Sequence, residues 1–118
     1  MGNKSLLIVD DSKLARMMIR NIVEQHHPEI DIQEAANADE ALDQQNHHKF
    51  EYMTIDFNMP GMNGLDLADK LKNSQPGAEI YLLTANVQDA IRSKANDLGV
   101  KFIPKPINED KVAAVFAA

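Results

Sequence analysis

The chain has 118 residues, 44% of them hydrophobic and 25% charged, which is enough for one globular domain and too few for two. The absence of cysteine excludes a disulfide framework and a thiolate metal site, and it fits a reducing compartment. The net charge of −6, from 18 acidic residues against 12 Lys and Arg, argues against direct nucleic-acid binding, which usually needs a basic stripe.

Apolar runs alternate with helical patterns along the chain. The elements predicted in chain order are strands at 5–11, 31–35, 52–56, 79–85 and 100–106, each followed by a helix, at 12–27, 37–48, 64–74, 87–99 and 108–118. This alternation predicts parallel strands joined by right-handed crossovers, in a sheet covered on both faces. The strands at 31–35 and 100–106 are expected at the edges, because the first alternates with polar residues and the second contains Pro104.

Several residues mark where the predicted helices begin and end. Ser12, Asn37 and Asn108 each precede a helical pattern and can accept hydrogen bonds from its first N–H groups. Glu40, three residues after Asn37, completes the pattern of a capping box. Gly99 closes the helix at 87–99 at a position that favours glycine.

The apolar face of the helix at 12–27 is predicted from residue spacing. Leu14, Met18 and Ile22 are four residues apart and are expected to face the core. The methionines as a group, Met18 included, are expected to fill the core and pack the loops. Arg16 and Arg20, one turn apart, are expected to be solvated or to form a small docking patch.

Polar residues end four of the predicted strands: Asp10, Asp11, Asp56, Thr84 and Lys105. The carboxyl ends of parallel strands meet at one rim, where open α/β sheets bind ligands. Three carboxylates at that rim would repel one another, and a hard divalent cation such as Mg²⁺ would offset the repulsion. An ammonium group and a hydroxyl beside one carboxylate predict phosphoryl transfer to Asp56.

With these residues in view, the chain resembles a bacterial two-component response-regulator receiver domain of the chemotaxis-regulator type over essentially its whole length. LIVDDSKLARMMIR resembles the opening strand with its acidic pair, DFNMPGMNG the phosphoacceptor loop, and LLTA and FIPKP the remaining two motifs. The spacings also fit, with Asp56 45 residues after Asp11, Thr84 28 after Asp56, and Lys105 21 after Thr84. The resemblance implies a (βα)5, flavodoxin-like doubly wound fold with a five-stranded parallel sheet in the order 2-1-3-4-5.

The resemblance further implies a single receiver domain over 1–118, without an output domain in this chain. Asp56 would accept a phosphoryl group from a phosphohistidine on a sensor histidine kinase or a histidine phosphotransfer protein. Asp11 and Asp56 would bind Mg²⁺ with the backbone carbonyl of Asn58, and Asp10 would act largely through water. The domain would thus promote its own phosphorylation and dephosphorylation without being an enzyme in the usual sense.

Switching is also implied by the resemblance. Lys105 and the N–H of Ala85 would bind the phosphoryl group, Thr84 would move towards it, and Phe102 would fill the vacated space. Phe102 replaces the tyrosine frequent in the family, and the Lys105–Pro106 bond would be cis. Asn58 and Asn86 stand where the family tunes the phosphate lifetime.

The surface formed by 87–99, 100–106 and 108–118 would change, and a downstream target protein or a missing output domain would read it. A homodimer on phosphorylation remains open, and the short final helix leaves open that the chain was cut from a longer regulator. No apolar stretch reaches the roughly 20 residues that span a bilayer, so we expect a cytoplasmic protein without membrane contact.

Three other functions remain as alternatives. A Mg²⁺-dependent aspartyl-phosphate phosphatase would need a second acid where Asn58 stands, and a cap domain. A flavin-binding protein would need a phosphate-binding loop where the chain has DDSKL, whose acids repel phosphate. A phosphate-independent interaction module on the same fold is disfavoured by the intact acidic set, but only a measurement of phosphorylation can exclude it.

Overall fold

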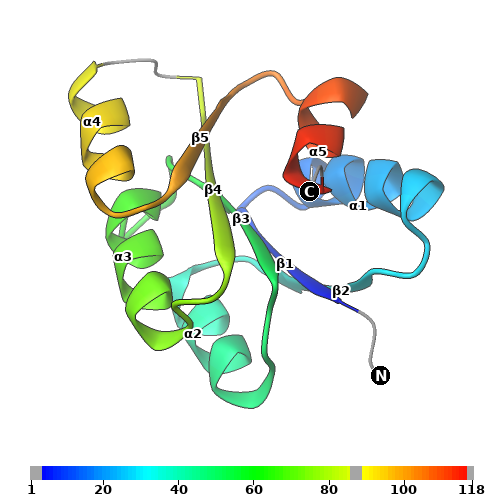
Figure 1. Ribbon diagram of the computed structural model, residues 1–118, viewed down its shortest axis with the longest axis horizontal. Coiled ribbons are helices and arrows are strands. Elements are labelled where there is room, and N and C mark those ends of the chain that lie inside the picture. Colours follow the sequence, from blue (N-terminus) through cyan, green and yellow to red (C-terminus); the bar gives the residue numbers. More distant parts are fainter. Residues whose placement is uncertain (1–3, 86–88, 117–118) are drawn as a thin grey trace.

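The computed structural model describes residues 4–85 and 89–116. Its strands are β1 (Ser5–Val9), β2 (Asp31–Ala35), β3 (Tyr52–Asp56), β4 (Glu79–Thr84) and β5 (Lys101–Pro104). Its helices are α1 (Lys13–His26), α2 (Ala38–His47), α3 (Gly64–Ser74), α4 (Asp89–Asp97) and α5 (Glu109–Phe116). The strands form one parallel sheet in the order β2-β1-β3-β4-β5, which confirms the predicted fold and both predicted edge strands (Figure 1).

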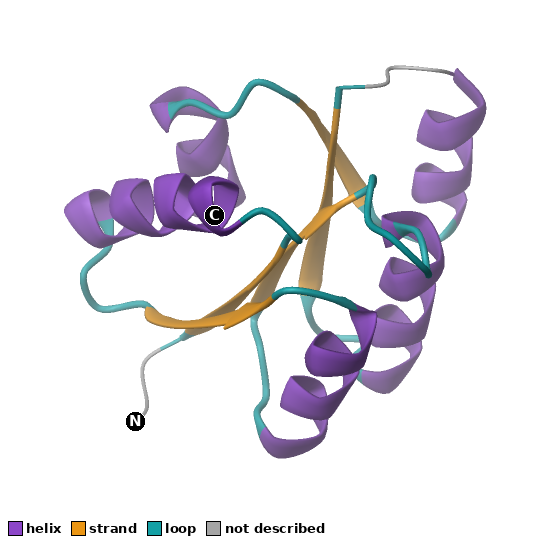
Figure 2. Ribbon diagram, turned by 180° about the vertical axis from the view of Figure 1, so that it is seen from behind, coloured by secondary structure: helices purple, strands orange, loops and turns teal. Residues whose placement is uncertain are grey.

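The sheet lies between two layers of helices. Helices α1 and α5 cover one face, and α2, α3 and α4 cover the other (Figures 1 and 2). Along β1, Leu6 and Ile8 point into the α1–α5 layer, whereas Leu7 and Val9 point into the opposite layer. Because both faces are covered, all four side chains are at most 1% exposed, which explains the continuous apolar run in the sequence.

The predicted helix caps are confirmed by hydrogen bonds. Ser12 Oγ accepts from the N–H of Ala15 at 3.2 Å, and Asn37 and Asn108 accept in the same way at 2.8 Å. Gly99 follows α4 with a φ of +74°, a conformation that favours glycine. The first two residues of the helix predicted at 87–99 lie outside the described residues. Among the described helices the longest has 14 residues, and none is long and apolar enough to cross a membrane.

The predicted apolar face of α1 is wrong for Leu14 and Met18, whereas Ile22 is partly buried and packs against the core as expected. The side chains of Leu14, Met17 and Met18 are 68%, 46% and 48% exposed, and we call these three residues the α1 apolar patch. The buried residues of α1 are Ile19 and Val23, which pack in the α1–α5 layer. Two neighbouring rows of apolar residues run along α1 with the same four-residue spacing. Periodicity alone therefore could not decide which row faces the sheet.

Candidate phosphoacceptor site

The carboxyl ends of four neighbouring strands bring the predicted polar residues to one rim of the sheet. Asp56 is the last residue of β3, and Thr84 is the last residue of β4. Asp10 directly follows β1 and Lys105 directly follows β5, so both lie one residue beyond the strands rather than inside them. Because the strands are parallel and adjacent, their ends converge although the residues are far apart in sequence.

The rim is built around a buried carboxylate and one ammonium group. Lys105 Nζ donates a hydrogen bond to Asp56 Oδ1 at 2.7 Å, and the Asp56 side chain is 4% exposed against 31% for Lys105. The Lys105 backbone N–H is itself bound to the carbonyl of Thr84 at 2.9 Å. The Lys105–Pro106 bond is cis, as the family resemblance implies.

A residue that the sequence analysis overlooked holds the turn that carries Lys105. The ammonium group of Lys111, on α5, donates to the carbonyl oxygens of Pro104 and Pro106, each at 2.8 Å. These two carbonyls flank Lys105 in the chain. The position of the lysine is therefore set from β4 on one side and from α5 on the other.

Three carboxylates gather beside this pair. Oxygens of Asp10, Asp11 and Asp56 lie within 4.8 Å of one another, with Asp10 and Asp56 buried and Asp11 exposed. Burial raises the pKa of Asp10; a hydrogen bond from the Ser12 N–H opposes the rise, and the charge of Asp56 adds to it.

One oxygen of this cluster lacks a partner. Asp10 Oδ1 accepts from the Ser12 N–H at 2.9 Å, whereas Oδ2 is buried without a hydrogen-bond partner among the described residues. Such an orphaned acceptor is costly unless an unseen group satisfies it. Three carboxylates and an orphaned oxygen form an all-oxygen donor set, which suits a hard divalent cation such as Mg²⁺. The residues therefore fit the metal that the sequence predicts.

The other predicted site residues come from β4, β5 and the loop after β3. Thr84 is fully buried at the end of β4, and Ala85 beside it is exposed. Asn58 is exposed in the loop after β3. Phe102 is partly buried on β5, with the guanidinium of Arg92 5.2 Å from its ring centre. Asn86 lies outside the described residues.

Gly64 makes a close approach that the sequence did not disclose. It opens α3, and its N–H donates to the carbonyl of Phe57 at 3.0 Å. A Cβ atom at Gly64 would lie 2.8 Å from the Cα of Phe57 and closer still to the carbonyl oxygen of Asp56. The first turn of α3 can therefore pack against the backbone of the candidate phosphoacceptor only because residue 64 has no side chain.

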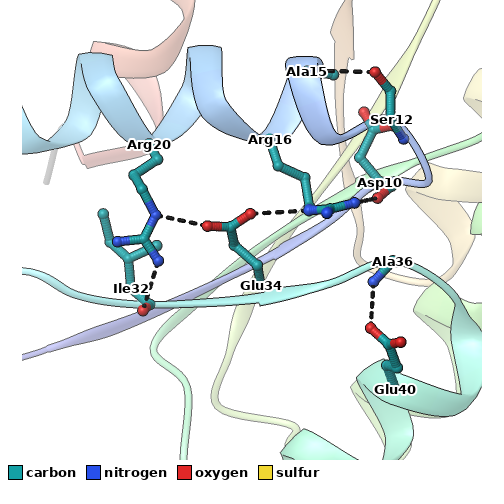
Figure 3. A network of polar contacts seen from close by, with 9 residues as sticks. All are labelled: Asp10, Ser12, Ala15, Arg16, Arg20, Ile32, Glu34, Ala36 and Glu40. Atoms are coloured by element: carbon teal, nitrogen blue, oxygen red, sulfur yellow. Dashed lines mark hydrogen bonds and ion pairs between the residues drawn. The ribbon is translucent and has the colours of Figure 1, made fainter.

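Arg16 and Arg20 are not the solvated residues that the sequence suggests. Both reach from α1 to Glu34 on β2, where Arg16 Nε binds Oε1 at 2.9 Å and Arg20 Nε binds Oε2 at 2.7 Å (Figure 3). Arg16 Nη1 also donates to the backbone carbonyl of Asp10 at 2.6 Å. Burial alone would raise the pKa of Glu34, but the hydrogen bonds from Arg20 and Arg16 outweigh it, so the pKa is lowered.

Comparison with known proteins agrees with this fold. Residues 6–117 match the response regulator receiver domain, and the chain belongs to that family. Chemotaxis protein CheY of Thermotoga maritima is 36% identical over 110 residues, which cover 92% of this chain and 91% of that protein. The sensory transduction protein LytT of Bacillus subtilis is 32% identical over 107 residues, covering 91% of this chain but 44% of that longer protein.

A solved structure of a similar protein contains a phosphorylated aspartic acid. A response regulator protein from Burkholderia pseudomallei, crystallised with a phosphorylated aspartic acid, a calcium ion and citrate, superposes with a TM-score of 0.88. The match has 28% sequence identity and covers 98% of this chain and 67% of that one. Receiver domains are signalling switches of two-component systems rather than classical enzymes, and the family match disfavours the phosphatase, flavoprotein and phosphate-independent alternatives.

Proposed function

We propose that Asp56 is the phosphoacceptor of this receiver domain and takes its phosphoryl group from a phosphohistidine on a sensor histidine kinase or a histidine phosphotransfer protein. The observation that carries the proposal is the buried Asp56 carboxylate, bound to Lys105 at 2.7 Å and flanked by Asp10 and Asp11. The phosphorylated aspartic acid and calcium ion in the Burkholderia pseudomallei relative support the same chemistry here.

The transfer makes one bond and breaks another. An oxygen of the Asp56 carboxylate attacks phosphorus, a P–O bond forms, and the P–N bond to the donor imidazole breaks. The bonding electron pair leaves with the imidazole nitrogen, which takes up a proton. The phosphorylated aspartyl group then carries about two negative charges at neutral pH in place of one. Later attack by water on the phosphorus releases inorganic phosphate and restores the carboxylate. The same residues of the rim would promote this dephosphorylation.

Each residue of the rim has a proposed part in this step. Asp11, Asp56 and the backbone carbonyl of Asn58 would hold Mg²⁺ directly, and Asp10 would hold it largely through water. Bound there, the metal supplies positive charge that neutralises the phosphoryl oxygens. Lys105 already lies against Asp56 and would move its hydrogen bond from the carboxylate to the phosphoryl group.

The proposed switch links the rim to one side of the sheet. Thr84 and the N–H of Ala85 would bind the phosphoryl group, and Phe102 would follow the movement of Thr84. Thr84 on β4 lies opposite Pro104 on β5, and Phe102 is two residues before Pro104. Because side chains two residues apart on a strand point the same way, Thr84 and Phe102 lie on the same face of the sheet. To shift the domain from mostly inactive to mostly active, the phosphoryl group must bind the active conformation several kcal/mol more favourably than the inactive one. A shift from about 1:99 to about 99:1 needs about 5.5 kcal/mol.

Two surfaces are available to partners. The α1 apolar patch follows the acidic pair within the chain, and exposed apolar groups at that place suit the docking of the phosphohistidine donor. A downstream protein, an output domain or a second copy of the chain would read the surface of α4, β5 and α5.

The absence of cysteine supports a cytoplasmic location.

The test is the intact mass of the purified protein after incubation with acetyl phosphate and Mg²⁺. A gain of about 80 Da, expected for one phosphoryl group, should appear in the wild type and vanish in Asp56→Asn and in EDTA. Continued labelling of Asp56→Asn would contradict the assignment. If folded wild-type protein neither gained mass nor bound beryllofluoride, the phosphate-independent interaction module would replace this proposal.

A further inference from the structure

We propose that Arg16 is a positioning residue of the acidic site, which orients the backbone between Asp10 and Asp11 while Glu34 holds Arg16 in place. The inference rests on the proposed function, because it assigns Arg16 a part in the affinity of that site for a divalent cation. The arrangement is drawn in Figure 3, where Arg16 spans the space between Glu34 and the segment that follows β1.

The polar atoms of Asp10 are almost all held by the protein. Its N–H donates to the carbonyl of Ala35 at 3.1 Å, and its Oδ1 accepts from the Ser12 N–H at 2.9 Å. Its carbonyl oxygen accepts from Arg16 Nη1 at 2.6 Å. Only Oδ2 remains buried without a hydrogen-bond partner in the described ranges, so it is the atom left for a cation or its water. Among the groups that hold Asp10 here, only Arg16 contributes through its side chain.

Arg16 is itself fixed. Its side chain is 14% exposed, and its Nε binds Glu34 Oε1 at 2.9 Å. The other oxygen of Glu34 binds Arg20, which also donates to the carbonyl of Ile32 at 3.3 Å. Glu34 on β2 lies opposite Ile8 on β1, and Ile8 is two residues before Asp10 in the chain. The network therefore ties α1 and β2 to the place where the chain leaves β1.

The shape of the side chain matters more than its charge. A guanidinium donates from Nε and Nη1 in fixed directions, so Arg16 can hold Glu34 and the Asp10 carbonyl together, whereas a lysine cannot reproduce that fork. The carboxylate of Glu34 offsets positive charge beside the metal ligands. If Arg16 acted only through its charge, removing it would strengthen cation binding. If it acts by orienting Asp10 and Asp11, removing it weakens cation binding.

The experiment measures the Kd for Mg²⁺ by isothermal titration calorimetry on the full chain. Arg16→Gln and Arg16→Lys should each weaken binding about tenfold, the size usual when a partner of a metal ligand is lost. Arg20→Gln is the matched control, because Arg20 shares Glu34 but directs its other hydrogen bonds to Glu24 and Ile32 and not to Asp10 or Asp11. Its Kd for Mg²⁺ should stay within about twofold of wild type. In metal-free protein, the amide resonance of Asp11 should shift in both Arg16 variants and not in Arg20→Gln.

Each result either supports or overturns the positioning role of Arg16. An unchanged or tighter Kd in Arg16→Gln, or an equal loss in Arg20→Gln, overturns the positioning role. If the Arg16 variants do not fold, Glu34→Gln replaces them: weaker Mg²⁺ binding with a shifted Asp11 amide supports the inference, and wild-type values overturn it. Wild-type protein that binds Mg²⁺ and is labelled on Asp56 keeps the proposed function even if Arg16 has no effect. Wild-type protein that does neither refutes both.

Discussion

Lys105 Nζ lies 2.7 Å from Asp56 Oδ1, although 49 residues separate them in the chain. The bond joins the end of β3 to the residue after β5, across β4, which lies between these strands. The Asp56 side chain is almost fully buried, whereas Lys105 keeps 31% of its side chain exposed. The carboxylate therefore depends on the lysine for its charge partner, while the lysine retains contact with water.

We expect Lys105→Ala to keep the fold but to uncouple phosphorylation from the change at α4, β5 and α5. Because Asp56 loses a charged hydrogen bond, the free energy of unfolding should fall by about 1–2 kcal/mol, measured by urea denaturation. Coupling is measured from amide shifts on addition of beryllofluoride. Lys70→Ala is the control, since Lys70 is an exposed lysine on α3, outside the surface formed by α4, β5 and α5. A Lys105→Ala protein that switches fully would refute the coupling.

Divalent cations should stabilise the protein through the acidic cluster. At a Mg²⁺ concentration of 100 times the Kd, the gain in free energy of unfolding should be about 2.7 kcal/mol, and EDTA should remove it. The gain should shrink in Asp11→Asn, which loses one carboxylate of the cluster, and remain in Asp69→Asn, an exposed acid on α3. Thermal unfolding that is identical with Mg²⁺ and with EDTA would show that the cluster binds no cation.

Gly64→Ala should destabilise the protein and disturb Asp56. The added methyl group would overlap the backbone of Asp56 and Phe57, so we expect a loss of about 1–3 kcal/mol and slower labelling by acetyl phosphate. Gly77→Ala is the matched control, because nothing lies within 4 Å of a Cβ at that position. Equal stabilities of the two variants would mean that the close approach of α3 is not a constraint.

The contribution of Glu34 to stability should depend on pH. Its pKa in the folded protein is below the ordinary value near 4.5, because hydrogen bonds from Arg20 and Arg16 outweigh burial. The unfolded state therefore binds the proton more tightly, and the stabilisation is fully present above about pH 4.5 and lost as the pH falls through the folded pKa. We expect the free energy of unfolding of the wild type to exceed that of Glu34→Gln by about 1–2 kcal/mol at pH 7.

This difference in stability should shrink in acid, followed by urea denaturation between pH 7 and pH 3. Glu24→Gln provides the control, since Glu24 is 54% exposed and, within residues 4–85 and 89–116, pairs with Arg20 alone, at 3.4 Å. Its difference from wild type should be small throughout. A wild-type advantage over Glu34→Gln that persists undiminished at the lowest pH would contradict the proposed role of the ionised carboxylate.

Much of the fold could be predicted from the sequence because its signals are local. The bounds of β2, β3 and α3 agree with the predicted ranges, and Ser12, Asn37 and Asn108 cap the helices as expected. A cap or an apolar run involves only a few neighbouring residues. The candidate site followed from the same signals, since parallel strands bring their polar ends to one rim whatever packs around them.

Other features depended on contacts between distant parts of the chain. Two rows of apolar residues on α1 have equal spacing, and only packing against β1 and α5 decided that Ile19 is buried and Met18 exposed. Arg16 contacts Asp10, 6 residues away, and Glu34, 18 residues away. Gly64 lies against the backbone of Asp56, 8 residues away. Each of these contacts depends on how a helix packs against the sheet. Propensity and periodicity describe one element at a time, so the sequence by itself determined the elements and the rim, whereas tertiary packing decided which side chains support the site.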